Sequence, residues 1–596
     1  MHDITRAAPP SLGRGALWPG LAAAMALALA MLTLQVQVNG STSPYATDVG
    51  EIQNALPRWG TLHFIGYPLY SMTGSLLVTL LRLVGVAPAA AGGALVAAVS
   101  LSAWIDASIA EVHTMTMALT VASLLMALRY RRSGARADLL WLTFAFTQGV
   151  AHQRAVAFLV PAIALLAAPR WRQAIGAAGH VVAVALLAPL TYLYLPMRYW
   201  QGADWTFGQP GTWHGFWTMV ADTKAERILA APATFGEWWA RGLTIVRLVG
   251  DDLPLPLMAL GLAGLWALPR RRRGESAALT LAWLPYLALC VVIWEGDVSD
   301  ALLAVKLPLP FMAGVGLALI AGRVGARRRA MYPGGLVVLA VVIALPAVQH
   351  RPRVLAITRD RTATAIVDTV GALEPPDDGP TTLLALWGHE YWALRYAQAY
   401  EGRFSFLNLV DHNADVRAIA AAGHRLWTPA TTFYRLPPSW WEERLAGDVH
   451  LSSVRPGIVE VSTRPAEAWD VNAGTALDLG NGVRIASASL NRDDGRLVLT
   501  VYWAATEPPA RDYRVGVHVL TDAEPDGAED VAAQADQRHP VGGWYPTSRW
   551  RRGEVVRDHY VLPVPAGVSP VGVRVGMYYQ DSDGSFVNSP WLFLPW

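Results

Sequence analysis

The sequence predicts a polytopic α-helical membrane protein that ends in a water-soluble half, and two observations support this. Of the 596 residues, 53% are hydrophobic and only 16% are charged, whereas soluble domains usually carry about 25% charged residues. The mean hydropathy is +0.29. The charges are also uneven, because residues 1–348 are apolar with clusters of arginine, and residues 349–596 have the composition of a soluble protein. Much of the first half must therefore contact lipid.

Eleven apolar runs are candidates for crossing a bilayer, which takes about 20 helical residues. The first is Leu17–Val38. A cleaved signal peptide is the alternative there, but the run is longer than a signal core and no clear small-x-small cleavage site follows it. The 138–151 run is short, which favours a tilted or re-entrant helix. The other runs are expected at residues 69–86, 89–107, 114–130, 155–169, 175–197, 253–269, 277–294, 302–322 and 333–349.

The arginines between these runs indicate how the chain is oriented. With a cytoplasmic N-terminus, 17 cationic side chains fall on the cytoplasmic side and eight on the other, as the positive-inside rule expects. With eleven spans, the Asp48 segment and residues 349–596 then face away from the cytoplasm. The net charge of +2 argues neither for nor against a nucleic-acid partner, but the arginine clusters lie between apolar runs, which indicates membrane topology and not a nucleic-acid patch. The single cysteine, Cys290, excludes a disulfide within this chain.

The most informative segment is Tyr45–Tyr70, which follows the first apolar run and contains Asp48, Glu51 and His63. Carboxylates at a membrane boundary are unfavourable unless they lie in a wet cavity or at the interface, so they indicate a functional site. The alternative is a loop whose acids merely face water. We favour a functional site, because the Gly66-Tyr67-Pro68 turn leads straight back into an apolar run.

Further polar residues are expected on the same side of the membrane, at the ends of later spans. A structural protein has no need for such a concentration, so it predicts an active or binding site at this face. Four tryptophans in residues 199–217 fit either a loop that binds sugar or lipid, or the aromatic belt of a membrane interface. The polar residues are Asp106, Glu111, His113, Gln148, His152, Gln153, Arg154, Tyr192, Tyr194, Arg198, Glu295, Asp297 and Asp300.

Residues 349–596 are expected to form two domains. Strand-like runs at Thr382–Trp387 and Phe404–Val410 alternate with helical patterns at Tyr391–Tyr400 and Ala414–Ala422, which predicts a small α/β domain over residues 349–466. From residue 467 onward, apolar residues alternate with polar ones, as at Leu497, Leu499 and Val501. Many short alternating strands predict a β-sandwich over residues 467–596.

The motifs of the first half resemble those of the GT-C superfamily of membrane glycosyltransferases. In particular, they are similar to the protein O-mannosyltransferase-like family, formerly a domain of unknown function. Asp48-Val49-Gly50-Glu51 matches the family's Asp-x-Gly-Glu motif after the first helix, and His63–Tyr70 matches its His-Pro-x-Gly-Tyr-Pro-Leu-Tyr motif before the second. Weaker matches are Glu111-Val112-His113, His152 of a His-His pair, and Tyr194–Arg198.

The resemblance covers roughly residues 17–325 and, more loosely, the small α/β domain. Three departures from the family pattern stand out. Phe64-Ile65 replaces the step that contains proline, His113 replaces a tyrosine, and Gln153 stands where the second histidine of the pair is expected. These departures bear on the donor sugar and on the binding of phosphate more than on the fold.

The resemblance implies a GT-C-like transmembrane domain over residues 1–348, with about 11 transmembrane helices. The extracytoplasmic α/β domain (349–466) and a β-sandwich (467–596) follow. The sandwich resembles C-terminal domains of bacterial membrane glycosyltransferases and is a candidate carbohydrate-binding domain. The resemblance also implies a location in the bacterial inner membrane, with the N-terminus in the cytoplasm.

The resemblance further implies an inverting glycosyltransferase. It would move a sugar, with mannose as one candidate, from a polyprenyl-phosphate carrier to a hydroxyl of a protein or glycan at the extracytoplasmic face. Such a reaction needs a carboxylate to take the acceptor proton and cationic donors to stabilise the departing phosphate, a task that suits arginine. Phosphate is a good leaving group, so a second carboxylic acid is not required.

These needs assign candidate roles to eight residues. Asp48 is the candidate base, with a helix cap as the alternative, and Glu51 orients it or binds the acceptor, with a solvated glutamate as the alternative. Arg154 and Arg198 are candidate phosphate partners, and the alternative is that they snorkel to lipid headgroups. Candidate ligands of phosphate or sugar, some of which can also be purely structural, are His63, Tyr67, His152 and the supporting residue Glu111.

No metal or other cofactor is predicted. Asp48, Glu51, His63 and Glu111 have suitable ligand atoms for a divalent cation, but their spacing does not require one. Two other functions are open. One is a transporter or flippase of a lipid-linked sugar, although the sequence shows no inverted repeat of the kind that transporters use. The other is a non-catalytic membrane scaffold with a glycan-binding domain.

Overall fold

The computed structural model describes residues 28–63, 67–72, 101–221, 231–252, 273–292, 348–376, 379–466 and 476–596, with gaps at 29, 494–495, 526 and 566 and isolated residues between 255 and 266. The chain divides into two compact units, Met1–Ala363 and Thr364–Trp596. Residues 348–358 form a helix of the first unit, so this unit extends beyond residue 348.

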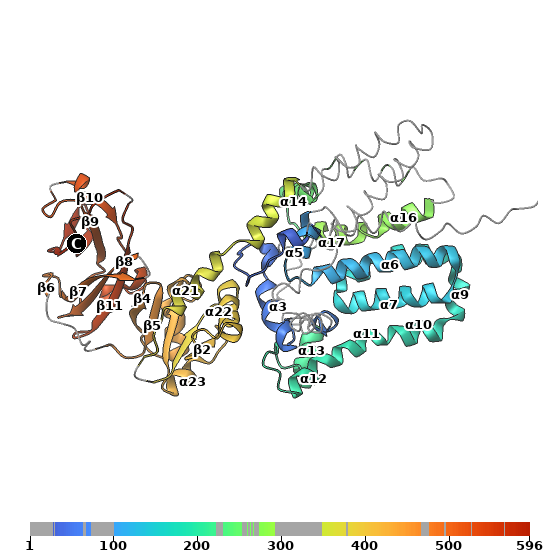
Figure 1. Cartoon of the computed structure of the whole chain (residues 1–596), viewed down its shortest axis with the longest axis horizontal. Coiled ribbons are helices and arrows are strands. Elements are labelled where there is room, and N and C mark those ends of the chain that lie inside the picture. Colours follow the sequence, from blue (N-terminus) through green and yellow to red (C-terminus); the bar gives the residue numbers. More distant parts are fainter. Residues whose placement is uncertain are drawn as a thin grey trace, which may run out of the picture. The chain divides into compact units, whose positions relative to one another are not determined.

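The described part of the first unit is almost entirely helical (Figure 1). Shorter 3-10 turns link several of its helices: η1 (Pro44–Ala46), η2 (Leu56–Arg58), η4 (Arg154–Leu159), η5 (Ala168–Arg170) and η6 (Thr191–Leu193). The α-helices are α3 (Val49–Ala55), α5 (Leu101–Ser108), α6 (His113–Ser133), α7 (Arg136–His152), α8 (Val160–Ala167), α9 (Trp171–Gly176), α10 (Ala178–Ala185), α11 (Leu187–Leu190), α12 (Tyr194–Trp200), α13 (Trp213–Ala221), α14 (Phe235–Asp252), α16 (Arg273–Leu281) and α17 (Leu284–Val292).

Among the residues that the structure describes, three helical stretches are long and apolar enough to cross a membrane: Arg154–Gly176, Ala178–Trp200 and Arg273–Val292. They correspond to the runs expected at 155–169, 175–197 and 277–294. Helices of this length and composition are typical of an integral membrane protein. Helices α6 and α7 occupy the runs at 114–130 and 138–151. Of the first run the structure describes residues 28 and 30–38, which are helical as far as Thr33. The runs at 69–86, 89–107, 253–269, 302–322 and 333–349 lie wholly or largely outside the described residues.

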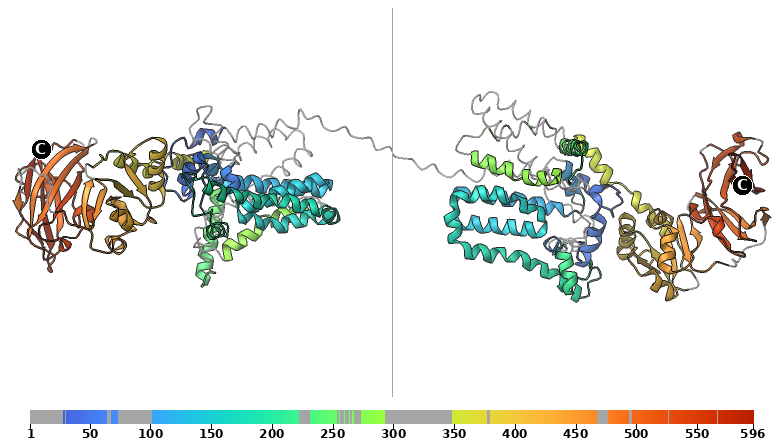
Figure 2. Two further views of the ribbon diagram at one scale, coloured as in Figure 1. Left: turned by 90° about the horizontal axis from the view of Figure 1, so that it is seen from below. Right: turned by 180° about the vertical axis from the view of Figure 1, so that it is seen from behind.

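Helices α6 and α7 form a hairpin, because Gly134 ends α6 in the left-handed conformation with a φ of 65°. Arginines gather at this turn. Arg129 pairs with Asp138 at 3.1 Å and Arg132 pairs with Glu275 at 2.9 Å. Figures 1 and 2 show α6, α7 and α10–α11 side by side, with α9 at the arginine end and α3 and α12 at the other. The helical unit therefore separates the arginines of its turns from the acidic segment of α3.

The second unit begins with a mixed five-stranded sheet in the order β2-β1-β3-β5-β4. Its first three strands are parallel, and β5 pairs antiparallel with both β3 and β4. The alternation of strands and helices predicted for residues 382–422 is confirmed. The elements are α21 (Ala365–Gly371), β1 (Thr381–Leu384), α22 (His389–Tyr400), β2 (Leu407–Val410), α23 (Val416–Ala421), β3 (Arg425–Pro429), α24 (Pro438–Leu445), β4 (His450–Arg455) and β5 (Ile458–Ser462), with 3-10 turns η9 (Thr362–Thr364) and η10 (Ala430–Tyr434).

Two antiparallel sheets follow, with strand orders β10-β9-β12-β13 and β11-β8-β7-β6, and β14 pairs with β12. Their inner faces share one hydrophobic core, to which β8 contributes Leu499, Val501 and Trp503 and β9 contributes Val515 and Val517. The predicted alternation of these strands is confirmed. The elements are β6 (Leu477–Asp478), β7 (Val483–Asp493), β8 (Arg496–Ala505), β9 (Arg514–Leu520), β10 (Val531–Gln534), α25 (Pro540–Gly543), β11 (Val555–Leu562), β12 (Gly572–Gln580), β13 (Phe586–Asn588) and β14 (Leu592–Pro595), with turns η11 (Ala528–Asp530) and η12 (Thr547–Arg549).

The mixed sheet and the sandwich are joined tightly. The same hydrophobic core contains Leu426 and Leu451 from the mixed sheet. A buried polar cluster also crosses the junction, because Nδ1 of His450 lies 2.9 Å from both the Tyr545 hydroxyl and the Glu554 carboxylate. The division at residue 467 stays a prediction, since one core runs through both parts.

A fully buried carboxylate, Asp558 on β11, fixes the turn that contains α25. Its Oδ2 accepts from the backbone N–H of Val541 at 2.8 Å and from the hydroxyl of Tyr560 at 2.5 Å. Val541 has a φ of 57°, and Gly542 and Gly543 have φ of 67° and 89°. A valine in the left-handed region is strained, so we infer that the Asp558 bond holds this turn.

We expect Asp558→Ala to destabilise the second unit, because it leaves two buried donors without an acceptor, at about 1–3 kcal/mol each. Thermal unfolding of the full chain in detergent, followed with limited proteolysis near Val541, measures the effect. The matched control is Asp522→Ala, since this aspartate is exposed. Equal melting of the two variants would contradict the anchoring role.

Candidate active site

Helix α3 lies in a packed environment that the apolar spacing of its residues explains. Val49, Ile52 and Ala55 are fully buried, in a hydrophobic cluster that also contains Trp104 of α5. The polar residue Gln53 is buried too, and its side chain accepts from the backbone N–H of Asn39 at 2.8 Å. The helix is therefore fixed on several sides, and the carboxylates that it carries have defined positions.

Glu51 points from α3 toward His63 and makes two hydrogen bonds with it. Its Oε1 accepts from the His63 backbone N–H at 2.8 Å, and its Oε2 lies 2.6 Å from Nδ1 of the ring. The Glu51 side chain is only 3% exposed. A solvated first-turn glutamate, the alternative considered from the sequence, does not describe this residue.

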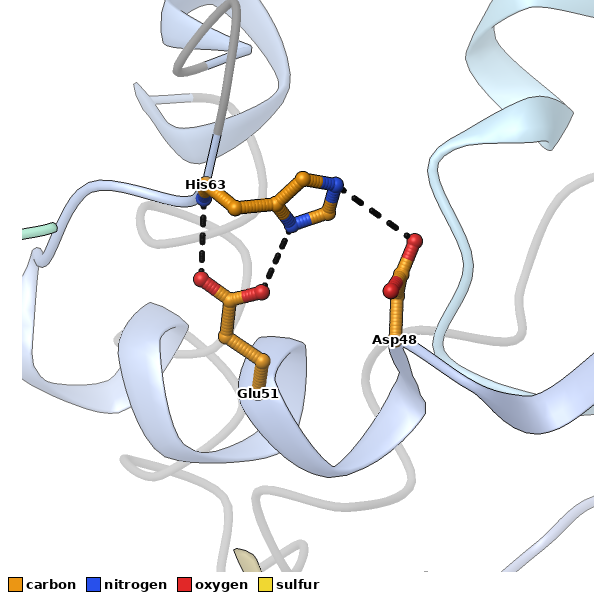
Figure 3. Close-up of side chains that lie close together, drawn as sticks. All are labelled: Asp48, Glu51 and His63. Carbon is orange, nitrogen blue, oxygen red and sulfur yellow. Dashed lines mark hydrogen bonds and ion pairs between the residues drawn. The ribbon is translucent and has the colours of Figure 1, made fainter. Parts of the chain in front are cut away.

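Asp48 lies on the other side of the same imidazole ring, as Figure 3 shows. Its Oδ2 is 3.6 Å from Nε2 of His63, and its side chain is 34% exposed. Asp48 occupies the N-cap position of α3, yet its side chain makes no capping hydrogen bond. The more exposed of the two carboxylates is therefore available to a ligand, while the buried one holds the histidine.

This arrangement determines which nitrogen of His63 carries a proton. When Glu51 is ionised, Nδ1–H donates to it, and Nε2 faces Asp48. Burial raises the pKa of Glu51 above its ordinary value of 4.5, and the contacts with His63 oppose that rise. The imidazole can thus take a proton that arrives at Asp48, either directly or through a water, while Glu51 stabilises the resulting imidazolium.

The chain between Glu51 and His63 is held by α12. Trp59 is in the left-handed conformation with a φ of 54°, and its carbonyl accepts from the Tyr194 hydroxyl and from Nε of Arg198, both at 2.7 Å. Gly60 follows, where an added Cβ would lie 2.8 Å from the carbonyl oxygen of Trp205. Only glycine fits this close approach, so α12 and the loop after it position the turn that presents His63.

Aromatic rings line the histidine. Tyr67 meets His63 edge to face with 5.7 Å between ring centroids, and Phe207 does so at 6.5 Å. Tyr67 also contacts the ring of His152 at 5.4 Å. The predicted residues Tyr67 and His152 therefore lie beside the carboxylate–histidine group.

His152 and Glu111 are buried close to this group. Nε2 of His152 lies 3.0 Å from the carbonyl oxygen of Val112, to which it donates. Glu111 Oε1 lies 3.7 Å from Nε2 of His113. His113 begins α6 directly after Val112, whose carbonyl accepts from His152, so this residue also lies beside the site.

The two arginines predicted to bind phosphate bond backbone carbonyls in this structure. Arg198 donates to the carbonyls of Arg58 and Trp59. Arg154 is exposed and donates to the carbonyls of Val220 and Ala221, at the end of α13. Arg198 thus positions the loop before His63, and Arg154 is the more accessible of the two. The other predicted acids, Glu295, Asp297 and Asp300, lie outside the described residues.

A divalent cation has one candidate site among the described residues. One ligand atom each from Asp48, Glu51 and His63 lies within 4.8 Å of the other two, and carboxylate oxygens with an imidazole nitrogen suit zinc or manganese. Glu111, which the sequence analysis also considered, is not in this group. A cation that used Nδ1 of His63 would have to displace its 2.6 Å bond to Glu51.

Three residues of the site had no role assigned from the sequence, although His113 and Tyr194 were among the polar residues expected at this face. Phe207 lines His63, and its backbone N–H donates to Thr61 at 3.0 Å. Tyr194 fixes Trp59, and His113 lies near Asp48. The family motifs mark His113 and Tyr194, but no local pattern connects Phe207 to a segment 146 residues earlier.

No protein-family model matches this sequence, and no curated protein matches it. Among solved structures, the chain is similar to ArnT from Cupriavidus metallidurans bound to undecaprenyl phosphate, with 13% identity, coverage of 74% of this chain and 97% of that chain, and a TM-score of 0.45. It is also similar to the apo state of the same protein, with 14% identity, coverage of 75% and 98%, and a TM-score of 0.45. At this TM-score the similarity assigns neither a family nor an activity.

Proposed function

We propose that this protein is an inverting membrane glycosyltransferase, and that the Asp48, Glu51 and His63 group is its catalytic centre. The donor is a sugar on a polyprenyl-phosphate carrier, and the acceptor is a hydroxyl of a protein or glycan at the extracytoplasmic face. The class of donor is inferred from the sequence motifs, and the orientation in the membrane is inferred from the excess of arginine in the turns on one side. Mannose is the first sugar to test, because the same motifs resemble those of the protein O-mannosyltransferase-like family.

One observation carries the catalytic assignment. A partly exposed carboxylate that makes no capping bond lies 3.6 Å from an imidazole, which a buried carboxylate holds from the other side at 2.6 Å. The buried pair of His450 and Glu554 in the second unit is a structural contact, whereas here a partly exposed carboxylate, Asp48, also faces the imidazole.

The proposed reaction is a single displacement. The acceptor oxygen forms a bond to the anomeric carbon as its proton passes to Asp48. The bond between the anomeric carbon and the phosphate oxygen breaks, and its electron pair leaves with the phosphate. The configuration at the anomeric carbon is inverted, and the proton on Asp48 can move to Nε2 of His63.

The departing phosphate needs positive charge and hydrogen-bond donors. Arg154 is the first candidate, because it is exposed. Arg198 acts through the loop that it holds, and Tyr67, His152 and Glu111 complete the walls around the sugar. Loss of Arg154 would lower turnover because the departing phosphate loses a cationic donor. Loss of Arg198 would lower turnover because the loop that positions His63 loses its support.

Asp48→Asn tests the base directly. Asn keeps the size of the side chain but cannot accept a proton at neutral pH, so turnover of a labelled polyprenyl-phosphate mannose should fall by about 10²–10⁴-fold, the usual contribution of a general base. Glu51→Gln should reduce turnover less, because a glutamine oxygen can still accept one bond from His63. Purified full-length protein and a radiolabelled donor provide the measurement.

The matched control is Asp251→Asn, which makes the same change at an exposed aspartate of α14. Its turnover should equal that of the wild type, and all three variants should melt at similar temperatures. Full activity of Asp48→Asn beside an inactive Glu51→Gln would assign the base to Glu51. Full activity of both would remove this segment from the catalytic centre.

The pH dependence of kcat/KM tests the role of Glu51. Burial raises its pKa, and protonated Glu51 no longer accepts from Nδ1–H, so activity should fall as the pH drops through a value above 4.5. This acidic limb should move or disappear in the residual activity of Glu51→Gln. An unchanged limb in that variant would assign the titration to another group.

A further inference from the structure

A pocket of about 380 Å³ lies in the second unit, where the mixed sheet meets the sandwich. Its polar lining comes from Ser453 on β4, from Asp536 and Gln537 after β10, and from His559 on β11. Pockets of about 300–1,000 Å³ hold small molecules. The described residues that line the pocket include no lysine or arginine, so it is not suited to an anion.

His559 presents a neutral ring to this pocket. Ser453 donates its only O–H to the carbonyl of Arg455 at 3.1 Å, so its oxygen accepts from Nδ1–H of His559, also at 3.1 Å. Burial and the neighbouring Arg557 lower the pKa of His559 to about 3. The ring is therefore neutral at physiological pH, and its Nε2 is an acceptor.

Two other side chains of the lining, Gln537 and Asp536, also offer acceptor oxygens. Oε1 of Gln537 is buried and has no hydrogen-bond partner among the described residues. Asp536 accepts from the backbone N–H of Val517 at 2.9 Å, and its side chain is 29% exposed. A buried acceptor without a donor is unfavourable, so a ligand that brings several hydroxyl donors would be stabilised here.

Aromatic rings lie next to one glycine of the lining. Gly542 lines the pocket, and an added Cβ there would lie 3.7 Å from Cδ1 of Trp544. The ring of Tyr434 meets Trp544 edge to face with 5.0 Å between centroids, and Tyr434 is 79% exposed. Flat rings beside hydrogen-bond acceptors suit a molecule that has both C–H faces and hydroxyl groups.

The turn that carries Gly542 is the one that Asp558 holds in a strained conformation. Backbone strain that the surrounding structure maintains occurs mostly at functional sites. In this turn Gly542 lines the pocket, and the Trp544 ring lies next to Gly542.

We propose that this pocket binds a neutral saccharide of one or two hexose units. Hydroxyl groups of the sugar donate to Gln537, Asp536 and His559, and its apolar face lies on Trp544. The proposal assigns residues to the carbohydrate binding that the sequence only indicated for residues 467–596. It does not depend on the catalytic proposal, since the two sites share no residue.

Binding to the full-length protein in nanodiscs tests the proposal, with saturation-transfer NMR on a panel of neutral disaccharides that contain mannose, glucose or galactose. We expect at least one disaccharide to bind. Gln537→Leu, which removes the acceptor and keeps the volume, should weaken binding about tenfold, the effect of one lost hydrogen bond. Trp544→Ala should weaken it as strongly.

The matched controls are Gln534→Leu on β10 and Trp596→Ala, which make the same changes outside the pocket and should bind like the wild type. The absence of binding by the wild type to every disaccharide would overturn the proposal. So would wild-type binding by Gln537→Leu, or a preference for sugar phosphates over neutral sugars. If Trp544→Ala lowers the melting temperature, the binding of Gln537→Leu decides the test, because the Gln537 side chain makes no hydrogen bond to the described residues.

Discussion

The proposed chemistry depends on one contact, the 2.6 Å bond between the buried carboxylate of Glu51 and Nδ1 of His63. This bond directs Nε2 of the imidazole toward Asp48, so that the histidine can accept a proton from Asp48. Without it, Asp48 would be an ordinary surface aspartate at the start of a short helix. Burial of Glu51 strengthens the contact once His63 has taken up a proton, because opposite charges attract more strongly away from water.

The scaffold serves this contact. The buried face of α3 fixes Glu51, and the Trp59 carbonyl, bound by Tyr194 and Arg198, fixes the chain that leads to His63. Both supports come from helices at the end of the unit that lies opposite the arginine-rich turns. A membrane protein built in this way keeps its polar groups at one face and still places three ionisable side chains with little freedom.

The sequence could predict those site residues that lie in one short segment of the chain. Asp48, Glu51 and His63 stand close together in the chain between apolar runs, so their proximity followed from the motif. Burial was not predictable, because Glu51 and Asp48 lie three residues apart on one helix and differ only in what packs against them. The role of Arg198 was also hidden, since its partner carbonyl lies 139 residues earlier. Alternating strands were predictable from period-two patterns, whereas the shared core of the two sheets needed the structure.

The central claim is that sugar transfer takes place at the Asp48 carboxylate. A cryo-EM structure of the full-length protein with a non-transferable phosphonate analogue of polyprenyl-phosphate mannose tests it most directly. The account predicts that the anomeric carbon lies beside Asp48, with room for an acceptor oxygen at about 3–3.5 Å from that carbon and in contact with the carboxylate. A sugar bound away from the Asp48, Glu51 and His63 group, with the analogue fully ordered, would contradict it.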